Sequence, residues 1–232
     1  MIKAVLFDLD NTLIDFMRMK KSAISAALDA MIAAGIKLEK EAASAILYKI
    51  YDKHGIEYQH VFQEFVKKNH PTLDYRIVAE GIVAYRKVQP AMLQPYVNVI
   101  PTLLALKQKK LKLGIVTDAP QRNAWLRLVE MRLQHFFDAV VCFEQTKKLK
   151  PSKLPFKKAL SMLQVSAENC IMVGDWPERD IKGAKKLGMV TVFAQYGSIK
   201  VIKRSGADFD IGDVAELVPI VDRVDKYLRK KA

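Results

Sequence analysis

Two acidic residues stand two positions apart, directly after a short apolar run near the start of the chain. Asp8 and Asp10 follow the run at residues 4–7. If the extended geometry continues beyond the run, both side chains lie on the same side of the strand, because successive side chains of a strand alternate. Two carboxylates held close together make it harder for both to be ionised. A divalent cation, or a division between one ionised and one protonated acid, would account for the pair.

Further polar residues occur where later apolar runs stop, or in the loops just beyond them. Taken singly, each has an ordinary explanation as a turn residue, a helix N-cap or a solvated loop lysine. Together they combine a hydroxyl, an ammonium and two more carboxylates at the expected edge of one sheet, which is typical of a catalytic site. These residues are Thr117, Asp118, Lys150, Asp175 and Asp180.

The apolar spacing predicts the elements that hold these residues. Strands and helices are expected to alternate, and this alternation predicts an α/β fold, a doubly wound parallel sheet with helices on both faces. In such sheets ligands bind outside the carboxyl ends of the strands, where the polar residues stand. The expected strands span residues 3–8, 111–117, 139–143, 170–173 and 190–193. The expected helices span residues 100–109, 123–133, 155–163, 180–187 and 214–228.

A long segment between the first and second strands has a different pattern. Over residues 16–88, apolar side chains recur at helical spacing with no strand between them, which predicts about four helices in a row. We therefore expect a catalytic core formed by residues 1–15 and 89–232, with residues 16–88 inserted as an α-helical cap subdomain. Because the insertion leaves the core just after the first strand, it is expected to hang over the polar edge.

The chain is basic, but its charge has no nucleic-acid motif. Its 232 residues carry a formal net charge of +13. The lysines and arginines are spread along the chain, without zinc-finger spacing or aromatic residues interleaved in a basic patch. This spread argues against nucleic acid as a partner. It favours a solvated basic surface that steers small anionic substrates.

The remaining composition indicates a reduced compartment. Cys142 and Cys170 stand in apolar runs without metal-ligand spacing, so buried free thiols are expected. No stretch approaches the roughly 18 apolar residues of a membrane span, which predicts no membrane partner and a cytoplasmic protein. The apolar faces of the helical insertion leave a homodimer open.

Four sequence motifs carry a resemblance to a known family. In order, and with matching spacing over about 175 residues, they resemble motifs one to four of the haloacid-dehalogenase-like (HAD) hydrolase superfamily. The helical insertion is similar to the cap of the subgroup that includes phosphoglycolate phosphatases. The resemblance implies a Rossmann-like HAD core. The four motifs are Asp8-Leu9-Asp10-Asn11-Thr12-Leu13, Ile115-Val116-Thr117-Asp118, Lys150-Pro151, and Val173-Gly174-Asp175 with Asp180.

The resemblance implies a role for each matched residue. Asp8 is expected to be the nucleophile that forms an aspartyl-phosphate, and Asp10 the general acid and base. The Thr117 hydroxyl, a backbone N–H at Asp118 and the Lys150 ammonium are expected to bind the phosphoryl group. A Mg²⁺ cofactor is expected on Asp8, the Asp10 backbone carbonyl and Asp175, with Asp180 orienting that shell or Lys150.

The implied function is that of a Mg²⁺-dependent phosphatase. It is expected to hydrolyse a phosphate monoester, a small phosphorylated metabolite, through the aspartyl-phosphate. Asp10 favours phosphate chemistry, because a dehalogenase needs no acid there. Two alternatives stay open at this point. One is a phosphomutase that uses the same intermediate, and the other is a non-catalytic nucleic-acid or protein-binding module on a HAD-like scaffold.

Two local departures from the family pattern leave choices open. Lys147, Lys148 and Lys153 are rivals of Lys150 for the third motif, and Lys150 is preferred because a proline follows it. Trp176 makes an unusual loop after the fourth motif. Its ring is expected to pack either over a substrate or against the helical insertion.

Overall fold

The structure is a computed structural model that describes the backbone of residues 1–231 and the side chains of residues 1–229. The chain divides into two compact units. One contains Met1–Asp15 and the chain from Gln94 onward, and the other is Phe16–Leu93. The expected boundary at residue 88 falls inside helix α4 (Tyr75–Met92), which carries Pro90 in its last turn. A proline there removes only one backbone hydrogen bond near the helix end and does not stop the helix earlier.

The first unit is built on a six-stranded sheet whose paired strands are all parallel. The strand order is β3-β2-β1-β4-β5-β6, so β1 lies in the middle between β2 and β4. This arrangement confirms the expected doubly wound α/β class. The strands are β1 (Ala4–Phe7), β2 (Lys112–Val116), β3 (Ala139–Val141), β4 (Cys170–Gly174), β5 (Val190–Ala194) and β6 (Phe209–Ile211).

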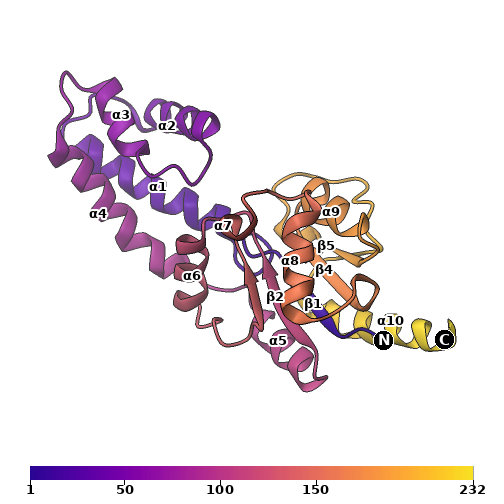
Figure 1. Cartoon of the computed structure of the whole chain (residues 1–232). Coiled ribbons are helices and arrows are strands. Elements are labelled where there is room, and N and C mark those ends of the chain that lie inside the picture. Colours follow the sequence, from indigo (N-terminus) through magenta and orange to yellow (C-terminus); the bar gives the residue numbers. More distant parts are fainter. Residues whose placement is uncertain (232) are drawn as a thin grey trace. The chain divides into compact units, whose positions relative to one another are not determined.

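Helices of the first unit stand between these strands in the chain, except α10, which follows the last strand. Helix α8 contacts β2 and β3, and it also contacts α9, which contacts β5. Figure 1 shows α8 running alongside the strands. The helices are α5 (Val99–Gln108), α6 (Gln121–Glu130), α7 (Phe143–Thr146), α8 (Lys153–Leu163), α9 (Lys182–Lys185) and α10 (Leu217–Lys231).

An apolar core joins this layer of helices to the sheet. Leu6 and Met172 on the strands and Phe156 and Leu163 on α8 are almost fully buried in one cluster. Burying each such side chain contributes about 1.5–3 kcal/mol. This packing fixes the strands against the helices, so the loops at the strand ends start from a rigid support.

The short helix α7 was not expected, and it begins at the last residue of the strand expected at residues 139–143. Two further features of the first unit also differ from the expected elements. The helix expected at residues 180–187 is a π-helical turn, Pro177–Ile181, followed by the short α9. The edge strand β6 was not expected, because it has only three residues and the exposed Asp210 stands in its middle. Both differences lie in short segments whose apolar pattern is weak.

The second unit contains four helices, as expected for the insertion. They are α1 (Phe16–Ala33), α2 (Lys40–His54), α3 (Val61–Asn69) and α4. Helices α1 and α4 pack against each other along much of their length and share an apolar cluster with α2 and α3. Within this unit the buried Lys20 ammonium lies 4.7 Å from the ring centre of Tyr51 and 5.2 Å from that of Tyr85. The aromatic faces therefore stabilise a charge that burial alone would disfavour.

Both cysteines are buried free thiols, as expected from their apolar surroundings. Burial raises the pKa of the Cys142 thiol to about 11 and that of the Cys170 thiol to about 12, so both are protonated near neutral pH. Within residues 1–231, none of the helices combines the length and the apolar character that crossing a membrane requires.

Candidate active site

The polar residues of three motifs follow three adjacent strands. Phe7, the last residue of β1, pairs with Ile115 on β2 and with Val173 on β4. Asp8 comes next, and its backbone N–H donates to the Val173 carbonyl at 2.9 Å, which continues the strand direction. Thr117 follows β2 and Asp175 follows β4. The central position of β1 therefore brings the first, second and fourth motifs to one edge of the sheet.

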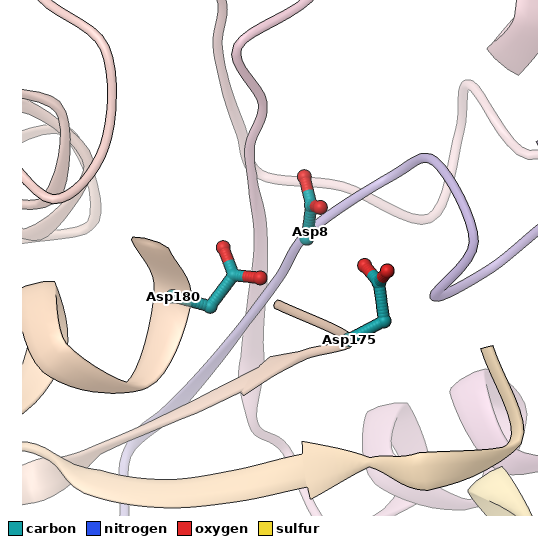
Figure 2. Close-up of side chains that lie close together, drawn as sticks. All are labelled: Asp8, Asp175 and Asp180. Atoms are coloured by element: carbon teal, nitrogen blue, oxygen red, sulfur yellow. The ribbon is translucent and has the colours of Figure 1, made fainter. Parts of the chain in front are cut away.

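Three carboxylates gather at this edge. Each of Asp8, Asp175 and Asp180 offers an oxygen atom, and these atoms lie within 4.8 Å of one another. Figure 2 shows the three side chains close together, with Asp8 and Asp175 at strand ends and Asp180 on the following helical turn. The Asp180 carboxylate is fully buried and accepts a hydrogen bond from the Trp176 N–H at 3.0 Å. This group is a candidate site for a metal ion.

Lys150 connects two of these carboxylates. Its ammonium lies 2.7 Å from Asp8 Oδ1 and 2.6 Å from Asp180 Oδ1, and it donates to the Val116 carbonyl at 3.0 Å. The Lys150 side chain is buried, whereas the rival lysines at positions 147, 148 and 153 are exposed. Of the four candidates for the third motif, Lys150 is the one that the structure places beside Asp8.

The electrostatics of this edge favour a bound cation. Burial, followed by the charges of Asp8 and Asp180, raises the pKa of Asp175 to about 9. Burial also raises the pKa of Asp180, to about 7, although Lys150 opposes the shift. Burial alone would lower the pKa of the Lys150 ammonium, but the carboxylates of Asp180 and Asp8 raise it above its ordinary value. The protein therefore cannot easily keep Asp175 and Asp180 ionised together with Lys150 as their nearby cation.

A divalent cation fits this donor set. Three ionised carboxylates and one ammonium leave two negative charges, which one such cation would neutralise. The donors are carboxylate oxygens, the ligands that Mg²⁺ prefers, and Mg²⁺ keeps several waters and so needs few protein ligands. Asp175 also accepts a hydrogen bond from the buried Thr12 hydroxyl at 3.2 Å, which orients its carboxylate.

These pKa shifts predict a pH-dependent effect of metal on stability. The pKa of Asp175 is raised on folding, so without metal its contribution to stability falls as the pH rises from about 4 to about 9. A divalent cation binds the ionised form and removes this penalty. We expect 5 mM MgCl₂, a concentration of order 100 times a typical Kd, to raise the melting temperature more at pH 8 than at pH 6, measured by calorimetry. An equal shift at both pH values would contradict the assignment of Asp175 to the cation site.

Asp10 does not belong to the carboxylate cluster. Its carboxylate Oδ2 accepts a hydrogen bond from Nη1 of Arg127 on α6 at 2.7 Å. The Arg127 side chain is only 5% exposed, so this ion pair is largely shielded from water. Arg127 was not among the residues predicted from the sequence. The available signal was its position with Ala124 and Leu128 on the buried face of α6, where an arginine is unusual.

Hydrogen bonds hold the loops of the second, third and fourth motifs together. Asp118 accepts from the Lys150 backbone N–H at 2.8 Å and from Nη1 of Arg179 at 3.1 Å. The Arg179 guanidinium stacks over the ring of Trp176 at 4.0 Å from its centre. The buried Thr117 hydroxyl accepts from the Ala119 N–H at 3.1 Å. Thr117 and Asp118 thus lie at the same edge as the carboxylate cluster, and Trp176 stacks on an arginine of its own loop.

The loop after β1 depends on a special backbone and a close neighbour. Asn11 has a φ of 59°, in the left-handed region that asparagine adopts more readily than most residues. A Cβ at Gly197 would lie 1.5 Å from the Asn11 carbonyl oxygen, so only glycine fits there. The Tyr196 hydroxyl donates to the Thr12 carbonyl at 2.8 Å. The segment after β5 therefore supports the first motif, and no feature of the sequence predicted this support.

The fold and the site together match a known class of hydrolases. The family model described as "Haloacid dehalogenase-like hydrolase" matches residues 5–194. This chain belongs to that family, which confirms the expected membership.

Proteins named as phosphatases are similar to this chain along nearly its whole length. The chain is 37% identical to a glyceraldehyde 3-phosphate phosphatase from Methanocaldococcus jannaschii, over 97% of this chain and all of the relative. It is 34% identical to a protein of the same name from Methanopyrus kandleri, again over 97% of this chain and all of the relative. Among solved structures, a HAD phosphatase from Thermococcus onnurineus is similar, with a TM-score of 0.70 and 27% identity over 95% of this chain and 98% of that one.

Proposed function

We propose that this chain is a Mg²⁺-dependent phosphatase that hydrolyses a small phosphate monoester, with glyceraldehyde 3-phosphate as the first candidate substrate. The observation that carries the proposal is the position of the Lys150 ammonium between Asp8 and Asp180, beside Asp175, at the ends of adjacent strands. The full-length similarity to glyceraldehyde 3-phosphate phosphatases supports the choice of substrate. It also agrees with the phosphatase expected from the motifs.

In the first half of the proposed reaction, Asp8 replaces the alcohol on phosphorus. A carboxylate oxygen of Asp8 forms a bond to the phosphorus while the bond to the ester oxygen breaks, and Asp10 gives its proton to the departing alkoxide. In the second half, water attacks the phosphorus of the aspartyl-phosphate and passes a proton to the Asp10 carboxylate. Inorganic phosphate leaves, and Asp8 and Asp10 return to their initial states.

The charges around Asp8 explain how an anion can approach a dianionic phosphate. During transfer the phosphoryl group spreads negative charge over three oxygens, and this charge repels Asp8 unless cations mask it. Lys150 lies against Asp8 and supplies one positive charge. Mg²⁺, held by Asp8, Asp175 and the Asp10 carbonyl, would supply further charge neutralisation. The Thr117 hydroxyl and the Asp118 N–H would hold phosphoryl oxygens.

The helical unit Phe16–Leu93 is proposed to act as a cap that selects the substrate. The similarity to the two glyceraldehyde 3-phosphate phosphatases extends through this segment, since it covers 97% of the chain. The formal net charge of +13 is proposed to attract small phosphate esters to the molecule.

A phosphate-release assay tests the proposal. We expect the protein with Mg²⁺ to release phosphate from glyceraldehyde 3-phosphate with a kcat/KM at least about tenfold above that for phosphoglycolate, glucose 1-phosphate or pyrophosphate, a preference of about 1.4 kcal/mol. EDTA should stop the reaction, and added Mg²⁺ should restore it. Full activity in EDTA would remove the cation from the mechanism. Isomerised sugar phosphate with slow phosphate release would instead indicate a mutase, and salt-sensitive DNA binding without turnover would indicate a binding module.

A further inference from the structure

The buried ion pair between Arg127 and Asp10 is not used by the mechanism above. Arg127 Nη1 donates to Asp10 Oδ2 at 2.7 Å, across 117 positions of sequence. The exposed fractions of the two side chains are 5% and 21%. The Asp10 side chain is therefore more exposed to solvent than the Arg127 side chain.

The location of Arg127 is difficult to explain by packing alone. Its neighbours on the same face of α6, Ala124 and Leu128, are apolar and fully buried. An apolar side chain of similar length would fill the position without the desolvation penalty of a guanidinium. A buried arginine opposite a specific carboxylate is therefore more informative than an arginine on the surface.

The pair also separates Asp10 from the other acids of the site. Asp8, Asp175 and Asp180 form one cluster around Lys150. Asp10 instead forms an ion pair with Arg127 of helix α6. The two cations thus contact different carboxylates: Lys150 lies beside Asp8 and Asp180, and Arg127 lies beside Asp10. A guanidinium donates directional hydrogen bonds to a carboxyl group, so it fixes the orientation of that group.

We propose that Arg127 is a positioning residue for Asp10. It holds the carboxylate at the place from which a proton can be exchanged with the leaving oxygen and with the attacking water. This inference rests on the proposed role of Asp10 as general acid and base. Arg127 is proposed to act through Asp10 and not on the substrate directly. Since a displacement of about 1 Å can slow an enzyme about 10²-fold, loss of the guanidinium should act on turnover more than on binding.

The test compares Arg127→Met with Arg122→Met, which removes an exposed arginine from the same helix. In steady-state assays with Mg²⁺ and glyceraldehyde 3-phosphate, Arg127→Met is expected to lower kcat by about 10- to 100-fold and to change KM by less than about threefold. Arg122→Met should match the wild type. Arg127→Lys should have an intermediate kcat, because an ammonium keeps the positive charge but lacks the planar set of N–H donors of a guanidinium.

A double-mutant cycle distinguishes positioning from a purely structural role. If Arg127 acts through Asp10, then Arg127→Met should lower kcat little further in an Asp10→Asn background, with all four proteins assayed on glyceraldehyde 3-phosphate. An equal loss in both backgrounds would overturn the proposal, as would wild-type kcat in Arg127→Met. If Arg127→Met fails to fold, Arg127→Lys decides: a reduced kcat at unchanged KM and melting temperature supports positioning, and wild-type kcat overturns it. Full activity of Asp10→Asn alone would instead refute the proposed role of Asp10.

Discussion

Replacement of Asp8 by asparagine is expected to abolish phosphatase turnover while the protein stays folded. The amide keeps the size of the side chain but is a far weaker nucleophile, so no aspartyl-phosphate can form. We expect kcat for para-nitrophenyl phosphate to fall by at least about 10³-fold, the scale of losses when a nucleophile is removed. Phosphate release under saturating Mg²⁺ measures this change, and circular dichroism checks the fold.

Asp225→Asn is a matched control for this variant. It makes the same chemical change far from the carboxylate cluster in sequence. The Asp225 carboxylate accepts a hydrogen bond from the backbone N–H of Ile2, which lies just before β1. The control should keep wild-type kcat. If Asp8→Asn turned over substrate as fast as the control, Asp8 would not be the nucleophile, and the covalent mechanism would have to be abandoned.

Loss of Lys150 has the second largest expected effect, because it changes both stability and activity. Lys150→Met keeps most of the length and apolar volume but leaves Asp8 and Asp180 without their shared cation. Removing one partner of a buried ion pair costs about 3–5 kcal/mol of stability. Loss of this charge from the transferring phosphoryl group should also lower kcat by about 10²–10³-fold. Urea unfolding and phosphate release measure the two effects separately.

Lys148→Met provides the control for this change, since that lysine stands two positions earlier and is exposed. Its stability should stay within about 0.5 kcal/mol of the wild type. Mg²⁺ is expected to restore part of the stability of Lys150→Met, because a divalent cation can neutralise the carboxylates that the lysine leaves behind. Unchanged stability and activity in Lys150→Met would show that the short distances to Asp8 and Asp180 have no energetic consequence.

The sequence predicted the sheet and its polar edge because both depend on local patterns. The short apolar runs before Asp8, Thr117 and Asp175 indicate buried parallel strands. Each strand ends where the polar residues begin. The strand order, with β1 between β2 and β4, was not predicted, because right-handed crossovers restrict the possible orders without fixing one. Lys150 was predictable through the proline that follows it and through the resemblance to a family motif.

The remaining parts of the site depend on contacts between distant segments, which periodicity cannot reveal. Arg127 approaches Asp10 from a helix 117 residues away, and Tyr196 reaches Thr12 across 184 residues. The π-helical turn at Pro177–Ile181 brings the Asp180 carboxylate close to Gly174, where an added Cβ would lie 2.4 Å from that carboxylate. A helical pattern in the sequence cannot distinguish such a turn from the ordinary α-helix that was expected there.

Trapping the covalent intermediate tests directly whether Asp8 is the nucleophile. Enzyme mixed with Mg²⁺ and substrate can be quenched in acid, and borohydride then reduces an aspartyl-phosphate to homoserine, which peptide mass spectrometry locates. If Asp8 is the nucleophile, homoserine is expected at position 8 in the wild type. None is expected there in Asp8→Asn or without substrate. Rapid release of phosphate with no modification at position 8 would contradict this role of Asp8.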